Sequence, residues 1–157
     1  MPGDPNKQII MTTGDRIASA AISVAAATSN AKYGGPPFSI HVFDCSYFVW
    51  LVLKTINPLY KREPSAEIAN DPLRFKPVVG PPQAGDIIYF PPAQVQWQVK
   101  RGDKRIYPGH VAIMLSPHSF IGMQTSGPGP KQVDLHNVWW NSRPSQFFRY
   151  VGPVSGK

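Results

Sequence analysis

The spacing of apolar residues in the first third of the chain predicts two helices. The first spans about 14–28, follows a capping threonine at position 12 or 13, and buries a stripe formed by Ile17, Ala20, Ala21 and Val24. The second runs from Ser46 to about Ile56 and is apolar on nearly every face, which is typical of a central helix. Asn57 and Pro58 end it.

Residues 57–83 contain six prolines and charges of both signs. This composition predicts a long loop with at most a short helix over 65–69. Such a loop is suited to form the wall of a binding cleft.

The second half of the chain has the pattern of β-strands. Apolar runs predict strands over 86–90, 110–115, 119–126 and 147–151. Residues 95–99, which include Trp97, alternate between apolar and polar and precede a basic turn over 100–105, which indicates a hairpin. We expect Trp139 and Trp140 to pack against the core or a sheet edge. Helices followed by an antiparallel sheet are typical of an α+β fold.

The composition suits one folded domain over residues 1–157, with its core at about 14–151. Of the residues, 42% are hydrophobic, and 18 prolines and 13 glycines are too few to indicate a low-complexity chain. The longest apolar run, residues 47–53, is too short to cross a bilayer, so we expect no membrane insertion.

The apolar stretch over 17–27 superficially resembles the centre of a secretory signal. Asp4 and Asp15 offset the nearby basic charges, and Ser19 and Ser23 interrupt the run. We therefore expect this stretch to belong to the fold and the protein to be made in the cytoplasm without a signal peptide.

A net charge of +7 and a pI of about 9.7 favour attraction to a polyanion. Nucleic acid, anionic lipid and the acidic bacterial cell wall all qualify. Nucleic acid is disfavoured because basic and aromatic residues do not interleave. The basic residues of the predicted hairpin are either a solvated tip or a guide toward the wall: Lys100, Arg101, Lys104 and Arg105. One cysteine and scattered histidines offer no metal-ligand spacing, so we expect no metal and no cofactor.

Cys45 is the candidate nucleophile. Asp44 is suited to cap the following helix, which would put the sulfur in the first turn, where the helix dipole favours a thiolate. A buried, inert thiol is the alternative. Among the four histidines, His110 opens a predicted strand that would hold its imidazole firmly, so we expect it to be the base.

Four segments resemble, in order, the motifs of the NlpC-like cell-wall cysteine peptidases. They read YGG at 33–35, FDCSYFV at 43–49, QAGDIIYF at 83–90 and GHVAIM at 109–114. The resemblance implies a papain-like α+β fold in which the cysteine begins a central helix packed on an antiparallel sheet. It also implies hydrolysis of an amide in peptidoglycan stem peptides.

By the same resemblance, Cys45 is the nucleophile and His110 the general base, and the Cys45 N–H contributes to an oxyanion hole. Tyr33, Asp44 and Ser46 are the expected substrate-binding residues. The last two would meet the free amine of a stem peptide.

The chain departs from the family at two positions. Tyr47 stands where the family usually has glycine, and the strand after His110 carries no second histidine. Gln124 is our candidate for orienting the imidazole, because a neutral amide can do so. On a strand it shares the face of Phe120 and not that of Ile121. The alternatives are an ordinary strand glutamine, or His118 or His136 in that role.

The sequence therefore predicts a cysteine amidase or endopeptidase acting on peptidoglycan. A small basic catalytic domain of this kind resembles the amidase effectors that type VI secretion delivers to the periplasm of rival cells, or a phage-type lytic enzyme. An effector implies two further partners, an immunity protein and a component of the secretion apparatus. The alternative is a catalytically weak or inactive module of the same fold that binds wall peptides.

Overall fold

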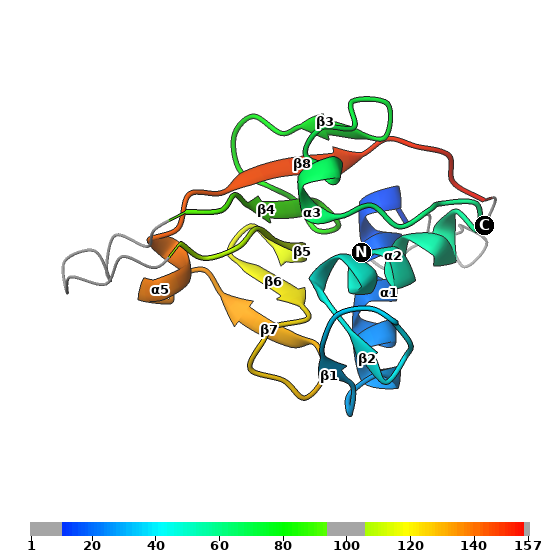
Figure 1. Cartoon of the computed structure of the whole chain (residues 1–157). Coiled ribbons are helices and arrows are strands. Elements are labelled where there is room, and N and C mark those ends of the chain that lie inside the picture. Colours follow the sequence, from blue (N-terminus) through cyan, green and yellow to red (C-terminus); the bar gives the residue numbers. More distant parts are fainter. Residues whose placement is uncertain (1–10, 94–105, 156–157) are drawn as a thin grey trace, which may run out of the picture.

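The computed structural model of the chain describes residues 11–93 and 106–155, which build a six-stranded antiparallel sheet flanked by helices (Figure 1). The strand order is β3-β8-β4-β5-β6-β7. In chain order the strands are β3 (Phe75–Pro77), β4 (Ile87–Phe90), β5 (His110–Ser116), β6 (Ser119–Gly122), β7 (Lys131–Asp134) and β8 (Gln146–Tyr150). The predicted α+β fold is confirmed.

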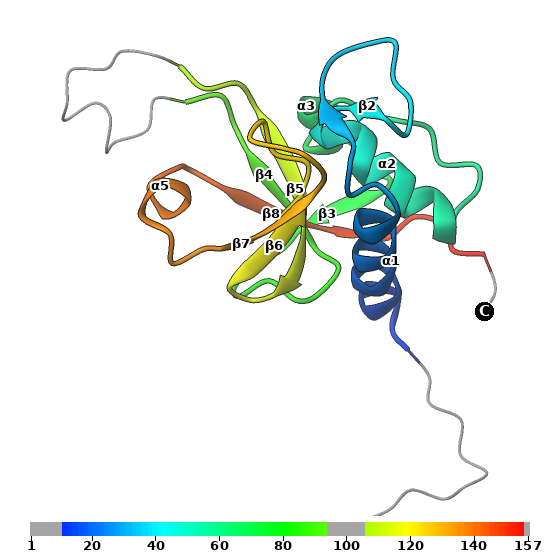
Figure 2. The same ribbon diagram turned by 90° about the horizontal axis from the view of Figure 1, so that it is seen from below.

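Two helices cover one face of the sheet and a short helix lies on the other (Figure 2). The covering helices are α1 (Thr13–Ala27) and α2 (Cys45–Ile56), and the short one is α5 (Val138–Asn141). The side chain of Thr12 accepts a hydrogen bond from the Asp15 N–H at 3.0 Å and so caps α1. A one-turn helix, α3 (Ser65–Ile68), follows α2.

Alternation along the strands divides the buried side chains between two clusters. The larger cluster lies between the sheet and the helices and includes Phe48 and Val49 of α2 with Val111 and Ile113 of β5. The smaller one lies on the other face, where Ile88, Phe90, Ala112, Met114 and Phe120 are buried and Trp140 of α5 packs against them. His110 belongs to this second face because it has the parity of Ala112 and Met114.

The strongest sequence patterns predicted their elements to within about a residue. Both long helices and α3 are present, as are β4, β5 and β8. Of the expected stripe on α1, Ile17 and Ala21 are buried, while Ala20 and Val24 are partly buried against the core.

Other elements differ from the prediction. The strand expected over 119–126 ends at Gly122, and the loop expected over 57–83 contains β3. Two-residue strands β1 (Lys32–Tyr33) and β2 (Val42–Phe43), which pair in parallel, were not predicted, and neither were β7 and α5. All of these elements are short, and β3 depends on a distant partner: Phe75 pairs with Tyr150 of β8.

The structure leaves some expectations untested. The predicted hairpin with Trp97 and the basic turn over 100–105 lies outside them. The extent of the domain over 1–157 stays a prediction. Within the described ranges, none of the helices combines the length and the apolarity that a bilayer span requires.

Candidate active site

Cys45 is the first residue of α2, and Asp44 caps that helix as expected. Oδ1 of Asp44 accepts hydrogen bonds from the Tyr47 N–H and from the Ser46 hydroxyl, both at 2.9 Å. This cap fixes the start of the helix and therefore the position of the Cys45 side chain, which is only 5% exposed.

The Cys45 sulfur is held between α2, β5 and β1. The backbone N–H groups of Val111 and Ser46 and the Tyr33 hydroxyl favour the thiolate form of Cys45 and so act to lower the pKa of its thiol. The β5–β6 pairing extends only as far as Ile113 opposite Ile121, so Val111 lies beyond the segment of β5 that pairs with β6. Because Val111 directly follows His110, the sulfur lies at the end of β5 where the candidate base begins.

Burial makes Cys45 a neutral thiol in the free protein. Desolvation raises the pKa of the thiol to about 11, and the Asp44 charge adds to this, although the N–H donors and Tyr33 act in the opposite direction. The helix N-terminus was expected to favour a thiolate, but loss of hydration outweighs the nearby N–H donors and raises the pKa of the thiol.

His110 is held by Gln124 on the face of the sheet opposite the helices. Its Nε2 lies 2.6 Å from Oε1 of Gln124, so Nε2–H donates and Nδ1 keeps the free electron pair. The imidazole packs beside the rings of Phe90 and Trp140, with centroid distances of 6.1 and 5.5 Å. Burial lowers the pKa of His110 to about 4, which the Gln124 contact opposes and the Arg143 charge reinforces.

Gln124 lies on the predicted face although its strand ends earlier than expected. The β5–β6 register pairs Met114 with Phe120, and continuing it places Gln124 opposite His110. Gly122 makes room for the contact, because a Cβ there would lie 2.7 Å from the Ala112 Cβ and 3.3 Å from Gln124 Oε1. The geometry thus brings Gln124 to His110, while its catalytic role stays a prediction.

The structure does not bring the two alternative histidines to the site. His118 lies in the turn between β5 and β6, at the opposite end of β5 from His110, and is exposed. His136 is also exposed and stacks on His118 with the ring centroids 5.3 Å apart.

Arg143 is a residue of the site that sequence reasoning missed. It is 6% exposed, and its Nη2 donates to the carbonyls of Pro91 and Pro108 at 3.1 and 3.0 Å. Its guanidinium interacts electrostatically with both Cys45 and His110. No local pattern distinguishes this arginine from the others, because its environment comes from distant segments.

A pocket of about 360 Å³ adjoins His110 and Gln124. Its remaining wall consists of aromatic and polar side chains from β7, α5 and the neighbouring loops: Tyr107, Thr125, Ser126, Lys131, Gln132, Val133, Trp139 and Trp140. Trp139 and Trp140 therefore not only pack within the protein but also line the pocket next to the candidate base.

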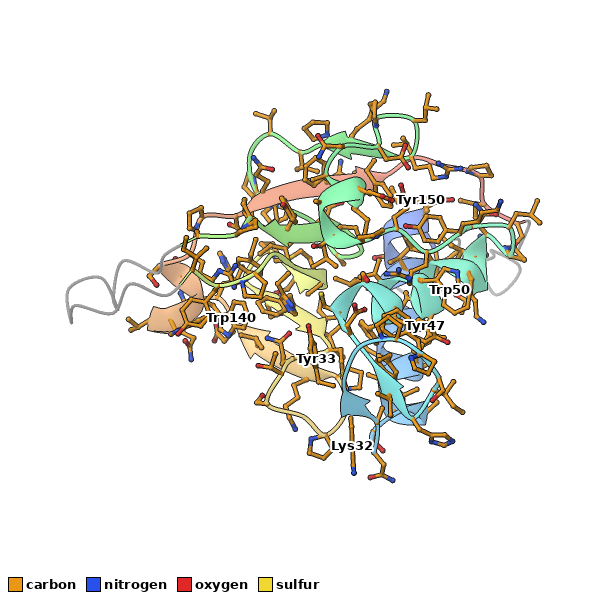
Figure 3. All side chains as sticks on the ribbon, in the orientation of Figure 1. Lys32, Tyr33, Tyr47, Trp50, Trp140 and Tyr150 are labelled. Atoms are coloured by element: carbon orange, nitrogen blue, oxygen red, sulfur yellow. The ribbon has the colours of Figure 1, made fainter. Side chains whose placement is uncertain are left out.

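The three expected substrate-binding residues surround Cys45. The Tyr33 side chain extends from β1 toward the strands (Figure 3), and its hydroxyl interacts electrostatically with Cys45. Asp44 and Ser46 are hydrogen-bonded to each other, and the Ser46 hydroxyl also accepts a hydrogen bond from Nη1 of Arg62 at 2.8 Å. Sequence reasoning did not single out Arg62.

Among the residues that the structure describes, no three His, Cys, Asp or Glu side chains gather in a way that could ligate a metal ion. The expectation that the protein needs no metal stays a prediction.

Comparison with known proteins finds similarity in structure only. No family model and no curated sequence matches the chain. The structure of NlpC1 from Trichomonas vaginalis matches over 92% of this chain and 47% of that one, at 18% identity and a TM-score of 0.57. The NlpC/p60 domain of the peptidoglycan hydrolase SagA matches over 82% of this chain and 96% of that one, at 18% identity and a TM-score of 0.52.

The chain has the fold of NlpC/p60 domains. The sequence motifs predicted this fold. The chain spans about half the length of the Trichomonas protein that it matches. The type VI effector–immunity complex Tae3–Tai3 from Ralstonia pickettii also matches, over 86% of this chain and 98% of that one, at 21% identity and a TM-score of 0.46.

Proposed function

We propose that the protein is a cysteine amidase or endopeptidase that hydrolyses amide bonds in peptidoglycan stem peptides. One observation supports the proposal: α2, which begins with the buried Cys45, packs against β5, which begins with His110, and the His110 Nε2 lies 2.6 Å from Oε1 of Gln124. The NlpC/p60 fold supports it, since SagA, which shares the fold, is a peptidoglycan hydrolase.

In the proposed reaction the Cys45 sulfur attacks the carbonyl carbon of the scissile amide while Nδ1 of His110 accepts the thiol proton. The carbonyl oxygen becomes an oxyanion, which the Cys45 N–H at the helix start is suited to stabilise. The C–N bond then breaks, and the leaving amine takes the proton from His110. Water, deprotonated by His110, hydrolyses the resulting thioester and releases the acid and the Cys45 thiol.

The pKa values favour proton transfer during the attack over an ion pair formed beforehand. With the thiol pKa at about 11 and the imidazole pKa at about 4, both groups are neutral at pH 7. Arg143 disfavours the imidazolium, and Gln124 favours it by accepting the Nε2–H bond. The Arg143 charge also stabilises the developing thiolate.

The neutral forms of Cys45 and His110 at pH 7 also favour the second candidate function, a weak or inactive module that binds wall peptides. A thiol with so high a pKa is a poor nucleophile unless substrate binding changes its surroundings. In this alternative the pocket beside His110 still holds a peptide, but the amide survives.

Digestion of purified sacculi separates the two functions. For the enzyme we expect the wild-type protein to release stem-peptide fragments whose masses identify the cut amide, and Cys45→Ala to bind sacculi without releasing them. Binding without release by the wild-type protein would establish the module instead.

We further propose that the protein acts in the periplasm of a target cell, as a delivered effector or a phage-type lytic enzyme. The sequence resemblance and the charge of +7, which suits an anionic wall, support this. An effector of this kind needs an immunity protein that blocks the cleft and a component of the secretion apparatus. Toxicity in the periplasm but not in the cytoplasm of an expressing bacterium would test the location.

A further inference from the structure

Two exposed histidines lie next to each other at the end of β5 opposite His110. His118 is in the turn between β5 and β6, and His136 is in the loop between β7 and α5. Their ring centroids are 5.3 Å apart, and the ring planes are tilted by 33°. The fold therefore brings together two imidazoles from separate segments, away from the candidate active site.

Backbone hydrogen bonds hold the two segments in this arrangement. Ser119 pairs with Asp134 where β6 meets β7, and the Leu135 N–H donates to the His118 carbonyl at 2.8 Å. The His136 N–H donates to Oδ1 of Asp134, also at 2.8 Å. The backbone on both sides of the pair is thus fixed, so the short distance between the rings follows from the strand register.

The ring nitrogens of this pair are available to a ligand. Within residues 11–93 and 106–155, the hydrogen bonds of His118 and His136 involve their backbone groups and not their rings. The two side chains line a depression of about 500 Å³, whose wall also includes the oxygen-bearing side chains of Ser116, Ser119 and Asp134. Imidazole nitrogens beside a carboxylate suit a cation better than an anion.

The spacing of the rings agrees with that of two imidazoles on one metal ion. With metal–nitrogen bonds of about 2.1 Å and a tetrahedral angle at the ion, the two ring centroids lie about 5 Å apart. Imidazole suits Zn²⁺, Ni²⁺ and Cu²⁺, whereas Mg²⁺ and Ca²⁺ prefer oxygen ligands. Because the described residues provide no cluster of three ligating side chains, water would complete the coordination.

The loop that carries His136 leads directly into α5, which forms part of the pocket beside His110. Asn137 caps this helix, because its side chain accepts hydrogen bonds from the N–H groups of Trp139 and Trp140 at 2.9 and 3.4 Å. Both tryptophans line that pocket. A ligand that holds His136 in place would therefore also hold the start of α5.

We propose that His118 and His136 bind one divalent transition-metal ion, of the class of Ni²⁺ and Zn²⁺, which fastens the start of α5 to the β5–β6 turn. At about 3.3 Å per residue, the length of β5 places the ion about 20 Å from His110. This distance is too long for the ion to take part in the proposed reaction. The site does not depend on the proposed function, and the expectation that catalysis needs no metal is unaffected.

Calorimetric titration with Ni²⁺ tests the site on the full chain, without added histidines. We expect one ion to bind per chain and Mg²⁺ not to bind under the same conditions. His118→Ala and His136→Ala should each weaken Ni²⁺ binding by at least about tenfold, the loss typical of removing even an outer partner of a metal ligand. His41→Ala is the matched control, since it removes another exposed histidine and should leave the Kd for Ni²⁺ unchanged.

Hydrogen exchange of the backbone amides of residues 138–141 tests the fastening of α5. With free Ni²⁺ at about ten times its Kd, an opening of α5 that breaks the site should become about tenfold rarer, so exchange should slow by the same factor. His118→Ala should abolish this slowing. Absence of Ni²⁺ binding, binding that both alanine variants retain, an equal loss in His41→Ala, or unchanged exchange in the Ni²⁺-bound protein would each overturn the inference.

Discussion

The two sides of the candidate site are built in different ways. The Cys45 side is largely local, because Asp44, Ser46 and Tyr47 are sequence neighbours whose hydrogen bonds form one helix cap. The His110 side is assembled from β4, β5, the residues after β6 and α5, which are far apart in the sequence.

The two sides also differ in what surrounds them. Cys45 belongs to the larger apolar cluster, between the sheet and the helices, and its dominant electrostatic influence is burial. His110 adjoins the smaller cluster; burial is also the largest influence on its pKa, and the hydrogen bond to Gln124 and the Arg143 charge modify it in opposite directions. We infer that substitutions on the Cys45 side act through the nucleophile and the core, whereas those on the His110 side adjust the base.

Removing the nucleophile should have the largest effect. We expect Cys45→Ala to reduce release of stem-peptide fragments by about 10⁴-fold or more, because no other group forms the thioester. Thermal unfolding should change by only a few degrees, since alanine fits the same buried position. Residual release above about one per cent would show that Cys45 is not the nucleophile.

The ionisation of Cys45 is the next test of the Cys45 side. A rise in the thiol pKa from 9.0 to about 11 reduces the thiolate population at pH 7, so alkylation by iodoacetamide should be about a hundredfold slower than in the unfolded chain. The rate should climb about tenfold per pH unit up to about pH 11. A rate that levels off below pH 8 would instead indicate a stable thiolate–imidazolium pair.

Gln124→Ala probes the His110 side. We expect turnover to fall roughly ten- to a hundredfold, or about 1.4–2.7 kcal/mol of barrier, because the imidazole loses its orienting bond. The Gln124 contact raises the pKa of His110, so its loss should move the acid limb of the pH profile, expected near pH 4, to lower pH.

His118→Ala and His136→Ala are the controls for Gln124→Ala, since both histidines lie away from His110. If Gln124→Ala keeps full turnover and either control loses it, then Gln124 is not the residue that orients His110.

A pair of tryptophan substitutions should give the smallest effects and compare the two sides directly. Trp140→Phe reduces the ring contact on His110, and we expect turnover to fall by about two- to fivefold, or about 0.4–1 kcal/mol of barrier.

Trp50→Phe on α2 loses the Nε1 hydrogen bond to the Tyr60 carbonyl, which should cost about 1 kcal/mol of stability and about 2–4 °C in Tm. Turnover of the folded Trp50→Phe protein should be unchanged, and equal losses of turnover in both variants would contradict the division between the sides.

The features that the sequence alone determined are those with a local physical cause. The apolar pattern predicted α1 and α2, Asp44 was identified as the cap from its position before Cys45, and strand parity placed Gln124 on the face of Phe120. Helix caps and the alternation of strand side chains depend on residues a few positions apart, so they are visible without a fold.

Features that combine distant segments were decided only by the tertiary structure. The short strand β3 exists because β8 pairs with it, and Arg143 and Arg62 acquired their positions from loops that fold back onto the site. The ionisation of Cys45 was also decided at this level, since the helix dipole acts locally whereas desolvation depends on every element packed around the thiol. Burial is a property of the whole fold, and it has a larger effect on the pKa of the Cys45 thiol than the neighbouring N–H donors have.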